Sequence, residues 1–361
     1  MLPDSFLLYG ANGYTGELIA RFAADQGLVA ILAGRRESAL EPLSHRLNLP
    51  YIVFDLNDKE KLISALQNVK AVLHAAGPFQ FTAKQMVEAC IETKTHYIDI
   101  NGDINIFELL KTYDWQAKEA GIMVMPGAGF DVVPTDCIAL LLKKTLPDAT
   151  SLKLAFVSTG GGVSHGTATT MINKLGEGGL MRKDGMLIPV ALGKHGMTVD
   201  FFTGAGKNNH KLFVMSIPWG DISTAHFTTG IPCIETFTGI SKNVYRFLVI
   251  QSLYNWLLRT GFIRGFIKKK INEKPAGPSD AIREKSRTFI WGNVTNAKGR
   301  SATAKLAGPD GYTFTMYSSL IIIKKILEGK FKTGYQTPSK VYGEDFVLEI
   351  PGVERDAVQF V

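Results

Sequence analysis

The sequence predicts an α/β protein whose first third forms a doubly wound parallel sheet. A second α+β domain with a mostly antiparallel sheet is expected to follow. Short apolar runs alternate with amphipathic stretches from Ser5 to about Met125. These runs lack the apolar–polar alternation of a half-exposed strand, as expected where helices cover both faces of a sheet. A chain of 361 residues also exceeds the usual size of one domain.

Strand and helix patterns follow one another along the first third of the chain. The predicted strands are 6–9, 29–33, 51–54, 71–75, 97–98 and 122–125. The predicted helices between them are 15–25, 38–47, 59–67, 83–92 and 104–119. This alternation predicts parallel strands that are joined by right-handed crossovers.

The pattern changes after Pro147. A helix is predicted from Pro134, in its first turn, to about Lys144. Beyond it, strand-like segments are mixed with glycine-rich loops and helices; these segments are 152–157, 211–217 and 312–317. We therefore expect a first domain at 1–137, a second at 138–330 and a tail at 331–361.

The chain carries a basic excess, with a formal net charge of +7. Such an excess is compatible with nucleic acid, anionic lipid or phosphorylated small molecules as partners. No zinc finger, RNP motif or basic-region helix is present, so we expect no nucleic acid partner. A phosphate-bearing cofactor explains part of the charge.

The three cysteines, Cys90, Cys137 and Cys233, have no metal-ligand spacing. So few cysteines are consistent with a reducing compartment. The amino terminus has neither the basic leader nor the apolar region of a signal peptide. We expect a cytoplasmic protein without a bound metal.

A glycine-rich segment follows the first predicted strand and opens the first predicted helix. Gly10 permits a sharp turn, Gly13 lets backbone amides approach a pyrophosphate, and Gly16 allows close packing of helix on strand. The positive end of the helix favours the bound anion. This context predicts a Rossmann dinucleotide site whose cofactor-binding residues are Gly10, Asn12, Gly13, Tyr14, Thr15 and Gly16.

The second predicted strand ends in Gly34-Arg35-Arg36. An NAD site normally offers an acidic side chain here to the adenosine ribose, whereas an NADP site offers arginine to the 2′-phosphate. Guanidinium groups suit phosphate by charge and bidentate geometry. Arg35 and Arg36 therefore favour NADP(H).

The next two predicted strands end in further cofactor candidates. Asp55 stands where an adenine contact is usual, although an aspartate there is also a common helix cap. Phe79 would pack near the nicotinamide or belong to the core. Small residues before it let the backbone pass close to the cofactor, and we assign to this contact Ala76, Gly77, Pro78 and Phe79.

These segments and three others resemble the saccharopine dehydrogenase-like NADP-binding family. More narrowly, they resemble its trans-acting enoyl reductase and uncharacterised branch. The other segments are Tyr97-Ile98-Asp99 with Gly102, Gly129-Phe130-Asp131-Val132-Val133-Pro134-Thr135-Asp136, and Gly334-Tyr335-Gln336-Thr337-Pro338 continuing to Gly343. The resemblance is dense over 5–137 and thin over 151–330. It implies a Rossmann domain, an inserted α+β domain and a tail that returns to the first domain.

Ligands of open α/β sheets bind outside the carboxyl ends of the strands, where Asp99 and Asp131 are expected. We assign Asp99 to cofactor binding. Asp131 would orient substrate or relay a proton, or would tie down its own loop. His165 lies in a glycine-rich segment that could close over substrate, with a solvated loop histidine as the alternative. Tyr97 would donate a phenolic proton or fill the core.

The stretch 245–270 combines a charge-free run at 247–258 with basic residues on both sides. Arg246 and Arg259 bracket this run too tightly for a membrane-spanning helix. Aromatic and basic residues together suit an interfacial membrane helix, a pocket cover or a dimer contact. The apolar and aromatic content of 245–267 favours a hydrophobic or lipid-like substrate.

We therefore expect an NADP(H)-dependent oxidoreductase that acts on a small molecule. On the family resemblance, it would transfer hydride to an activated C=C bond, as in enoyl reduction, or to a C=N bond, as in saccharopine-type amino-acid metabolism. The Tyr-x-x-x-Lys pair of short-chain dehydrogenases is missing, as are metalloprotease and nucleophile-elbow motifs. The alternatives are an NADP(H)-binding sensor or scaffold without turnover, and a peripheral membrane protein.

Overall fold

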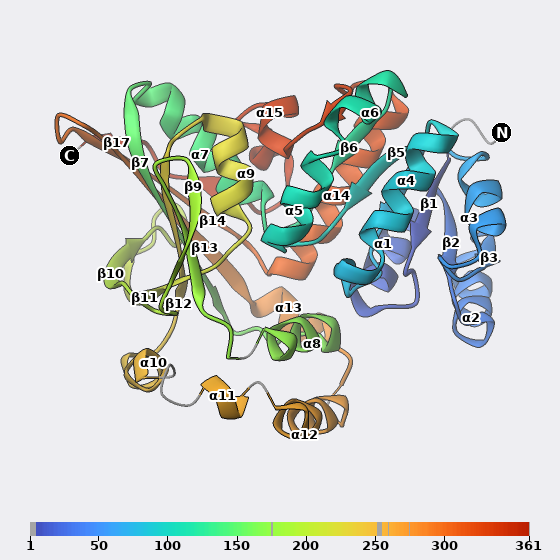
Figure 1. Ribbon diagram of the computed structural model, residues 1–361, viewed down its shortest axis with the longest axis horizontal. Coiled ribbons are helices and arrows are strands. Elements are labelled where there is room, and N and C mark those ends of the chain that lie inside the picture. The colour runs from blue at the N-terminus through green and yellow to red at the C-terminus, as the bar shows by residue number, and fades with distance from the viewer. Residues whose placement is uncertain (1–4, 175, 251–254, 259, 274, 361) are drawn as a thin grey trace. The chain divides into compact units, whose positions relative to one another are not determined.

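The computed structural model describes residues 5–174, 176–250, 255–258, 260–273 and 275–360. Two compact units divide the chain (Figure 1). Unit 1 comprises Met1–Val133 and Tyr312–Val341, and unit 2 comprises Pro134–Gly311 and Tyr342–Val361. Most of unit 2 is therefore inserted into the chain of unit 1. The domain limits predicted from sequence were 137/138 and 330/331, whereas the units meet at 133/134, 311/312 and 341/342.

Unit 1 is built on a seven-stranded parallel sheet in the order β15-β6-β5-β4-β1-β2-β3. Every residue of the central strands β1 and β4 is buried, which explains their uninterrupted apolar pattern. The strands are β1 (Ser5–Tyr9), β2 (Val29–Gly34), β3 (Tyr51–Val53), β4 (Ala71–His74), β5 (His96–Asp99), β6 (Met123–Met125) and β15 (Gly334–Tyr335).

Two groups of helices accompany this sheet. Helices α1 and α2 contact each other, and α4 contacts both α3 and α5. Because the strand order reverses at β1, right-handed crossovers place the two groups on opposite faces. The helices are α1 (Tyr14–Asp25), α2 (Glu37–Leu47), α3 (Lys59–Leu66), η1 (Phe79–Phe81), α4 (Ala83–Thr93), α5 (Ile104–Lys111) and α6 (Asp114–Glu119). The predicted doubly wound α/β fold is confirmed.

The single helix predicted over 104–119 is in fact two helices. Thr112 N donates to Leu109 O at 3.0 Å and Tyr113 N donates to Leu110 O at 3.1 Å, so the last turn of α5 tightens and ends.

The strand predicted over 312–317 was wrong, because these residues belong to helix α14 (Gly311–Leu327). Their aromatic and β-branched composition suits a strand, but tertiary packing determines the outcome. In unit 1, the rings of Tyr312 and Tyr317 lie 5.0 and 4.7 Å from those of Tyr14 and Phe22 on α1. The chain then enters β15, which pairs in parallel with β6. Helix α14 thus serves as the crossover that completes the sheet of unit 1.

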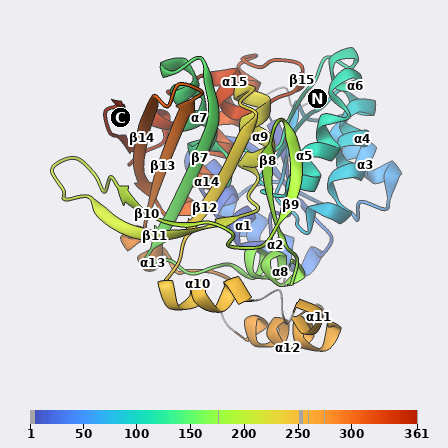
Figure 2. The same ribbon diagram turned by 60° about the vertical axis from the view of Figure 1, so that its left-hand side comes forward.

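Unit 2 contains a mostly antiparallel sheet, as predicted, in the order β10-β11-β12-β7-β13-β14-β16 (Figure 2). Among the described pairings, only β12 with β7 is parallel. The β8–β9 hairpin pairs with β12, and β17 pairs with β14. The strands are β7 (Ala149–Thr159), β8 (Gly179–Lys183), β9 (Met186–Val190), β10 (Gly196–Phe201), β11 (His210–Ile217), β12 (Cys233–Gly239), β13 (Arg287–Asn296), β14 (Ser301–Pro309), β16 (Glu354–Arg355) and β17 (Gln359–Phe360).

Unit 2 also contains helices. They are α7 (Val133–Thr145), α8 (His165–Asn173), α9 (Asp221–Thr229), α10 (Lys242–Val249), α11 (Asn255–Leu258), α12 (Gly261–Asn272), α13 (Asp280–Lys285) and η3 (Phe346–Glu349). Helix α15 (Pro338–Tyr342) lies almost wholly in unit 1. The stretch 245–270 falls on α10, α11 and α12, with residues 251–254 and 259 outside the described residues. No helix in the described part of the chain combines the length and apolarity needed to cross a membrane.

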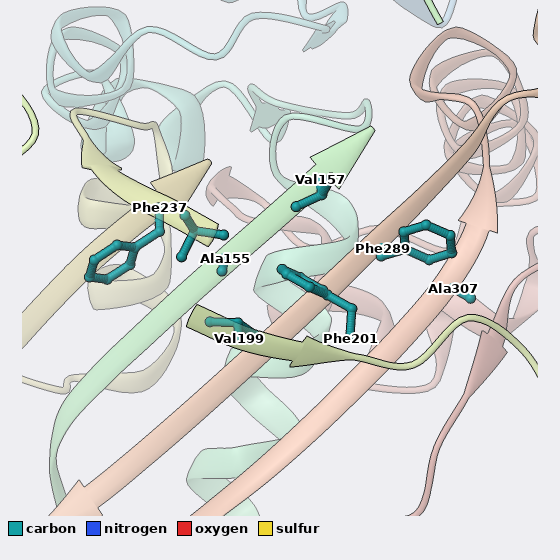
Figure 3. Close-up of a cluster of buried hydrophobic side chains, with 8 residues drawn as sticks. Ala155, Val157, Val199, Phe201, Phe237, Phe289 and Ala307 are labelled. Atoms are coloured by element: carbon teal, nitrogen blue, oxygen red, sulfur yellow. The ribbon is translucent and has the colours of Figure 1, made fainter. Parts of the chain in front are cut away.

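The core of unit 2 includes a cluster in which one end of the sheet folds over its middle. Figure 3 shows β10 crossing the face of β7 and β13. Val199 and Phe201 of β10 pack with Ala155 and Val157 of β7 and with Phe289 of β13. Five apolar side chains from three strands thereby fix the curvature of the sheet.

Candidate functional site

The loop between β1 and α1 requires glycine at its first position. Gly10 has φ +91°, a left-handed conformation. A Cβ on Gly10 would lie 2.8 Å from the backbone of Ala75 and Ala76 after β4. On the other side, Gly10 N donates to Ala33 O of β2 at 2.8 Å. The loop is therefore held between the carboxyl ends of β2 and β4.

The same loop brings the first turn of α1 close to β1. Gly13 N donates to Gly10 O at 3.0 Å, and Glu17 N donates to Gly13 O at 2.8 Å. A Cβ on Gly16 would lie 2.2 Å from Gly10 O, so only glycine permits this packing. Gly13 is the N-cap and has no side chain to bond the first-turn amides. The cradle fits a pyrophosphate, since amides and the helix dipole both favour an anion there.

Arg35, Arg36 and Asp55 gather at the carboxyl ends of β2 and β3. Arg35 is exposed, and its Nη1 lies 3.9 Å from Asp55 Oδ2. The other oxygen, Asp55 Oδ1, accepts from Asn57 N at 2.9 Å and from Asn57 Nδ2 at 2.6 Å. Asp55 thus forms a local turn, while the N-cap of α3 is Asp58. Both arginine side chains are exposed, an arrangement that suits a 2′-phosphate.

Asn12 links the glycine loop to this edge. A Cβ on Gly34 would lie 2.9 Å from Asn12 Oδ1. The Asn12 side chain therefore lies against Gly34, the last residue of β2. Gly34 directly precedes Arg35 in the sequence. Tyr14 and Thr15 occupy the first turn of α1, where the ring of Tyr14 contacts Tyr312.

The segment after β4 is held by two residues that the sequence analysis missed. The Gly77–Pro78 peptide is cis. Thr82 Oγ1 donates to Ala76 O at 3.0 Å, and His74 Nε2 lies 2.9 Å from the same hydroxyl. The His74 ring also meets Phe79 edge to face at 5.2 Å. A fully buried histidine, acting through the Thr82 hydroxyl and the Phe79 ring, therefore holds the segment 76–79 in place.

His74 is uncharged in this environment. Burial lowers the pKa of His74 to about 3. Its Nδ1 has no hydrogen-bond partner among the described residues. No sequence motif marks this pair, because Thr82 follows His74 by eight residues and lies outside β4.

The side chains of Tyr97 and Asp99 of β5 are buried and form a hydrogen bond with each other. Tyr97 Oη donates to Asp99 Oδ2 at 2.7 Å, and both side chains are fully buried. Asp99 also accepts from Asn101 N at 3.0 Å and from Gly127 N at 2.9 Å. Burial raises the pKa of the Asp99 carboxyl, and these hydrogen bonds oppose that rise. The carboxylate connects the end of β5 to the loop after β6.

Asp131 lies in that loop and is half-buried. A Cβ on Gly102 would lie 2.5 Å from Asp131 Oδ2, so the carboxylate packs against the backbone after β5. Helix α14, which also belongs to unit 1, supports the loop because Phe130 N donates to Thr315 Oγ1 at 3.0 Å. Of the three predicted catalytic residues, Asp131 alone is a partly exposed side chain at the carboxyl edge of this sheet.

His165 belongs to unit 2, whereas Tyr97 and Asp131 belong to unit 1. It is the first residue of α8, and its N donates to Ala276 O at 2.9 Å. The N-cap Ser164 accepts from Thr167 N at 3.3 Å. His165 is half-exposed. In the described part of the chain, no three His, Cys, Asp or Glu side chains gather into a possible metal site.

Comparison with known proteins agrees with this geometry. Residues 6–125 match the family described as saccharopine dehydrogenase NADP binding domain. Over 206 residues, the chain is 26% identical to saccharopine dehydrogenase-like oxidoreductase of Mus musculus, covering 50% of this chain and 48% of that protein. Over 153 residues, it is 29% identical to trans-acting enoyl reductase of Mycobacterium tuberculosis, covering 40% of this chain and 37% of that protein. The chain thus matches half or less of the length of these relatives.

The fold is also similar to that of a solved structure. Apo saccharopine dehydrogenase (L-Glu forming) from Saccharomyces cerevisiae aligns with a TM-score of 0.65 and 15% sequence identity. The alignment covers 99% of this chain and 100% of that chain. At this identity, the likeness shows the shared fold.

Proposed function

We propose that the chain is an NADP(H)-dependent oxidoreductase acting on an activated C=C bond. The match of residues 6–125 to the saccharopine dehydrogenase NADP binding domain supports the nucleotide-binding part of this proposal. The observation that carries the proposal is the glycine cradle between β1 and α1, in which added Cβ atoms on Gly10 and Gly16 would meet backbone. Backbone placed this closely serves a ligand that must approach main-chain amides. When bound, NADPH supplies a hydride, and an acid of the protein supplies the proton.

Unit 1 provides distinct parts of the cofactor site. The cradle holds the pyrophosphate, Arg35 and Arg36 hold the 2′-phosphate, and the segment ending in Phe79 lies along the nicotinamide side. Asp131 orients substrate or relays a proton, because its carboxylate is partly exposed at the carboxyl edge of the sheet. The Tyr97 hydroxyl is buried and bonded to Asp99, which favours a core role. His165 stays a prediction for an acid from unit 2.

The choice of substrate follows the relative named trans-acting enoyl reductase. A C=N bond of an imino acid is the second candidate, because the relative named saccharopine dehydrogenase-like oxidoreductase matches a longer part of the chain. NADPH oxidation should be followed with a panel of enoyl thioesters and a panel of imino acids. Turnover with one panel selects that bond. Tight NADPH binding without turnover on either would favour the sensor or scaffold alternative.

The preference for NADP(H) is tested by the double change Arg35→Ala with Arg36→Ala. Both side chains are exposed, so the fold should tolerate their loss. We expect the NADPH dissociation constant to rise about tenfold or more, with little change for NADH, since each charge-assisted bond to phosphate contributes about 1.5–3 kcal/mol. Fluorescence titration of both cofactors measures this. Equal losses for NADPH and NADH would contradict the assignment.

A second proposed role is contact with a membrane surface through α10 and α11. Val244, Val249 and Ile250 are exposed apolar side chains, and Trp256 is 72% exposed. Exposed basic residues lie on α10 and on the following helix α12, namely Lys242, Arg246, Lys268, Lys269 and Lys270. Exposed apolar residues beside basic ones suit an anionic lipid surface.

Vesicle flotation with Trp256→Ser tests this role. Trp115 of α6 offers a matched control, because it is 68% exposed and belongs to unit 1. We expect binding to vesicles that contain phosphatidylserine, with a several-fold loss for Trp256→Ser and none for Trp115→Ser. Protein that stays in solution at both low and physiological salt would refute the role. A homodimer and a cytoplasmic location stay predictions of the sequence.

A further inference from the structure

Two basic residues, His210 and Arg287, lie beside the apolar cluster of unit 2. They are on the same face of the sheet as the cluster. His210 of β11 pairs directly with Phe201 of β10, so the two side chains lie on the same face. Arg287 precedes Phe289 by two residues on β13, which again places both on one face. Phe201 and Phe289 are members of the buried cluster (Figure 3). His210 and Arg287 therefore stand at the rim of an apolar core.

A hollow of about 510 Å³ opens at this rim. Its wall consists of Arg287 and Phe289 from β13, His210 from β11, and the loop that joins β10 to β11. That loop contributes Thr203, Lys207 and Asn208. None of the residues that line the hollow is acidic. The lining thus combines two permanent cations, a histidine, two neutral polar side chains and one aromatic ring.

The Arg287 guanidinium is held in place by backbone. Its Nη1 donates to Glu284 O at 2.7 Å and to Ser286 O at 2.8 Å. Arginine carries further donors on Nε and Nη2, which these two bonds do not use. Within the ranges that the structure describes, neither Lys207 nor His210 forms an ion pair. The Lys207 ammonium group and the His210 ring are therefore available to a ligand.

The acidic residues closest to the loop have partners of their own. Asp200 Oδ2 accepts from Lys305 Nζ at 3.0 Å and from Asn209 Nδ2 at 2.9 Å. Glu354 Oε2 accepts from Ala205 N at 2.7 Å. These contacts fasten the middle of the loop at Ala205 and its end at Asn209. The carboxylates thereby position the loop, and among the described residues neither forms an ion pair with Lys207 or Arg287.

We propose that this hollow binds a phosphate-bearing small molecule. Arg287 and Lys207 contact the phosphate oxygens, His210 adds a ring nitrogen, and Phe289 supports an apolar or ring portion. A dianionic phosphate matches two permanent cations in charge, and a guanidinium held by backbone presents its remaining donors in a fixed plane. The site lies wholly within unit 2 and is independent of the nucleotide cradle of unit 1.

The test compares two double variants of the full chain. Lys207→Gln with Arg287→Gln removes the proposed contacts. Lys298→Gln with Arg300→Gln is the matched control, because both residues are exposed in the turn at the opposite end of β13 and β14. Each pair lowers the net charge by two, so general attraction of anions changes equally. Thermal melting of both variants checks that the fold is kept.

Phenyl phosphate, inorganic phosphate and benzoate are the probes, and calorimetric titration in the presence of saturating NADPH is the measurement. We expect phenyl phosphate to bind most tightly, and its dissociation constant to rise about tenfold or more in the Lys207/Arg287 variant alone. Tighter binding of benzoate would reassign the site to carboxylates and overturn the proposal. Equal weakening in both variants, or no binding of phenyl phosphate to the NADPH-saturated wild-type chain, would overturn it as well. Because NADPH is present throughout, a failure here leaves the proposed oxidoreductase function untouched.

Discussion

A methyl group added at Gly16 tests the nucleotide cradle directly. In Gly16→Ala, the new Cβ would lie 2.2 Å from Gly10 O and 3.0 Å from Ala11 Cα. Ordinary contact begins at 3.4 Å, so α1 and the loop must separate by about 1 Å. Both neighbours are backbone atoms, and no side-chain rotation can relieve the clash.

Two energies follow from this displacement. Overpacking of this kind costs about 1–3 kcal/mol of stability, and the better helix propensity of alanine returns up to about 1 kcal/mol. Amides that move away from a pyrophosphate lose charge-assisted hydrogen bonds that contribute about 1.5–3 kcal/mol each. We therefore expect the NADPH dissociation constant to rise between about tenfold and a hundredfold, while the free energy of unfolding changes only modestly.

Gly27→Ala is the control at the other end of α1. Gly27 has φ +67° and no heavy atom within 4 Å of an added Cβ. This change strains the backbone by about 1 kcal/mol without touching the loop. Fluorescence titration and urea unfolding measure both variants. If Gly16→Ala binds NADPH as well as the wild type, or if Gly27→Ala loses as much affinity, the cradle is not where the pyrophosphate binds.

Two further predictions concern buried residues of unit 1. Because burial lowers the pKa of His74 from 6.5 to about 3, the unfolded chain gains a proton below pH 6.5 that the native state does not take up, and stability falls as the pH falls. In His74→Gln, the slope of the unfolding free energy against pH should be smaller by about 1.4 kcal/mol per pH unit between about pH 6 and pH 4. Urea titrations at several pH values measure this slope. An unchanged slope would mean that His74 is charged in the native state. Tyr97→Phe removes a donor to the buried Asp99 carboxylate, so we expect a stability loss of about 1–3 kcal/mol with NADPH affinity and turnover unchanged. A variant of normal stability that has lost turnover would instead make Tyr97 a catalytic acid.

Local signals explain why the nucleotide cradle could be predicted from sequence. Gly10, Gly13 and Gly16 follow an apolar strand and open an amphipathic helix, and each acts on neighbours within a few residues. Arg35 and Arg36 are placed by the end of a single strand. Patterns that depend on short separations along the chain are visible in one sequence.

The supports of the site depend on contacts between distant residues and were not predictable in this way. Thr315 accepts from Phe130 N across 185 positions, and its surroundings have the composition of a strand. Asp99 was assigned to cofactor binding, which stays a prediction, and the sequence did not reveal that its carboxylate accepts from Gly127 N. His74 resembles any residue at the end of a buried strand. Only the tertiary structure brings these groups to their partners.

The insertion of residues 134–311 between β6 and α14 has a consequence for synthesis. Six strands of the nucleotide-binding unit precede the insertion, yet its sheet obtains one edge strand from Gly334–Tyr335 after it. A ribosome must therefore make the whole inserted segment before α14 and β15 can close the free edge of β6. Until then, the amides and carbonyls of β6 remain available to any other extended chain, so the sheet begun before the insertion is completed only after it.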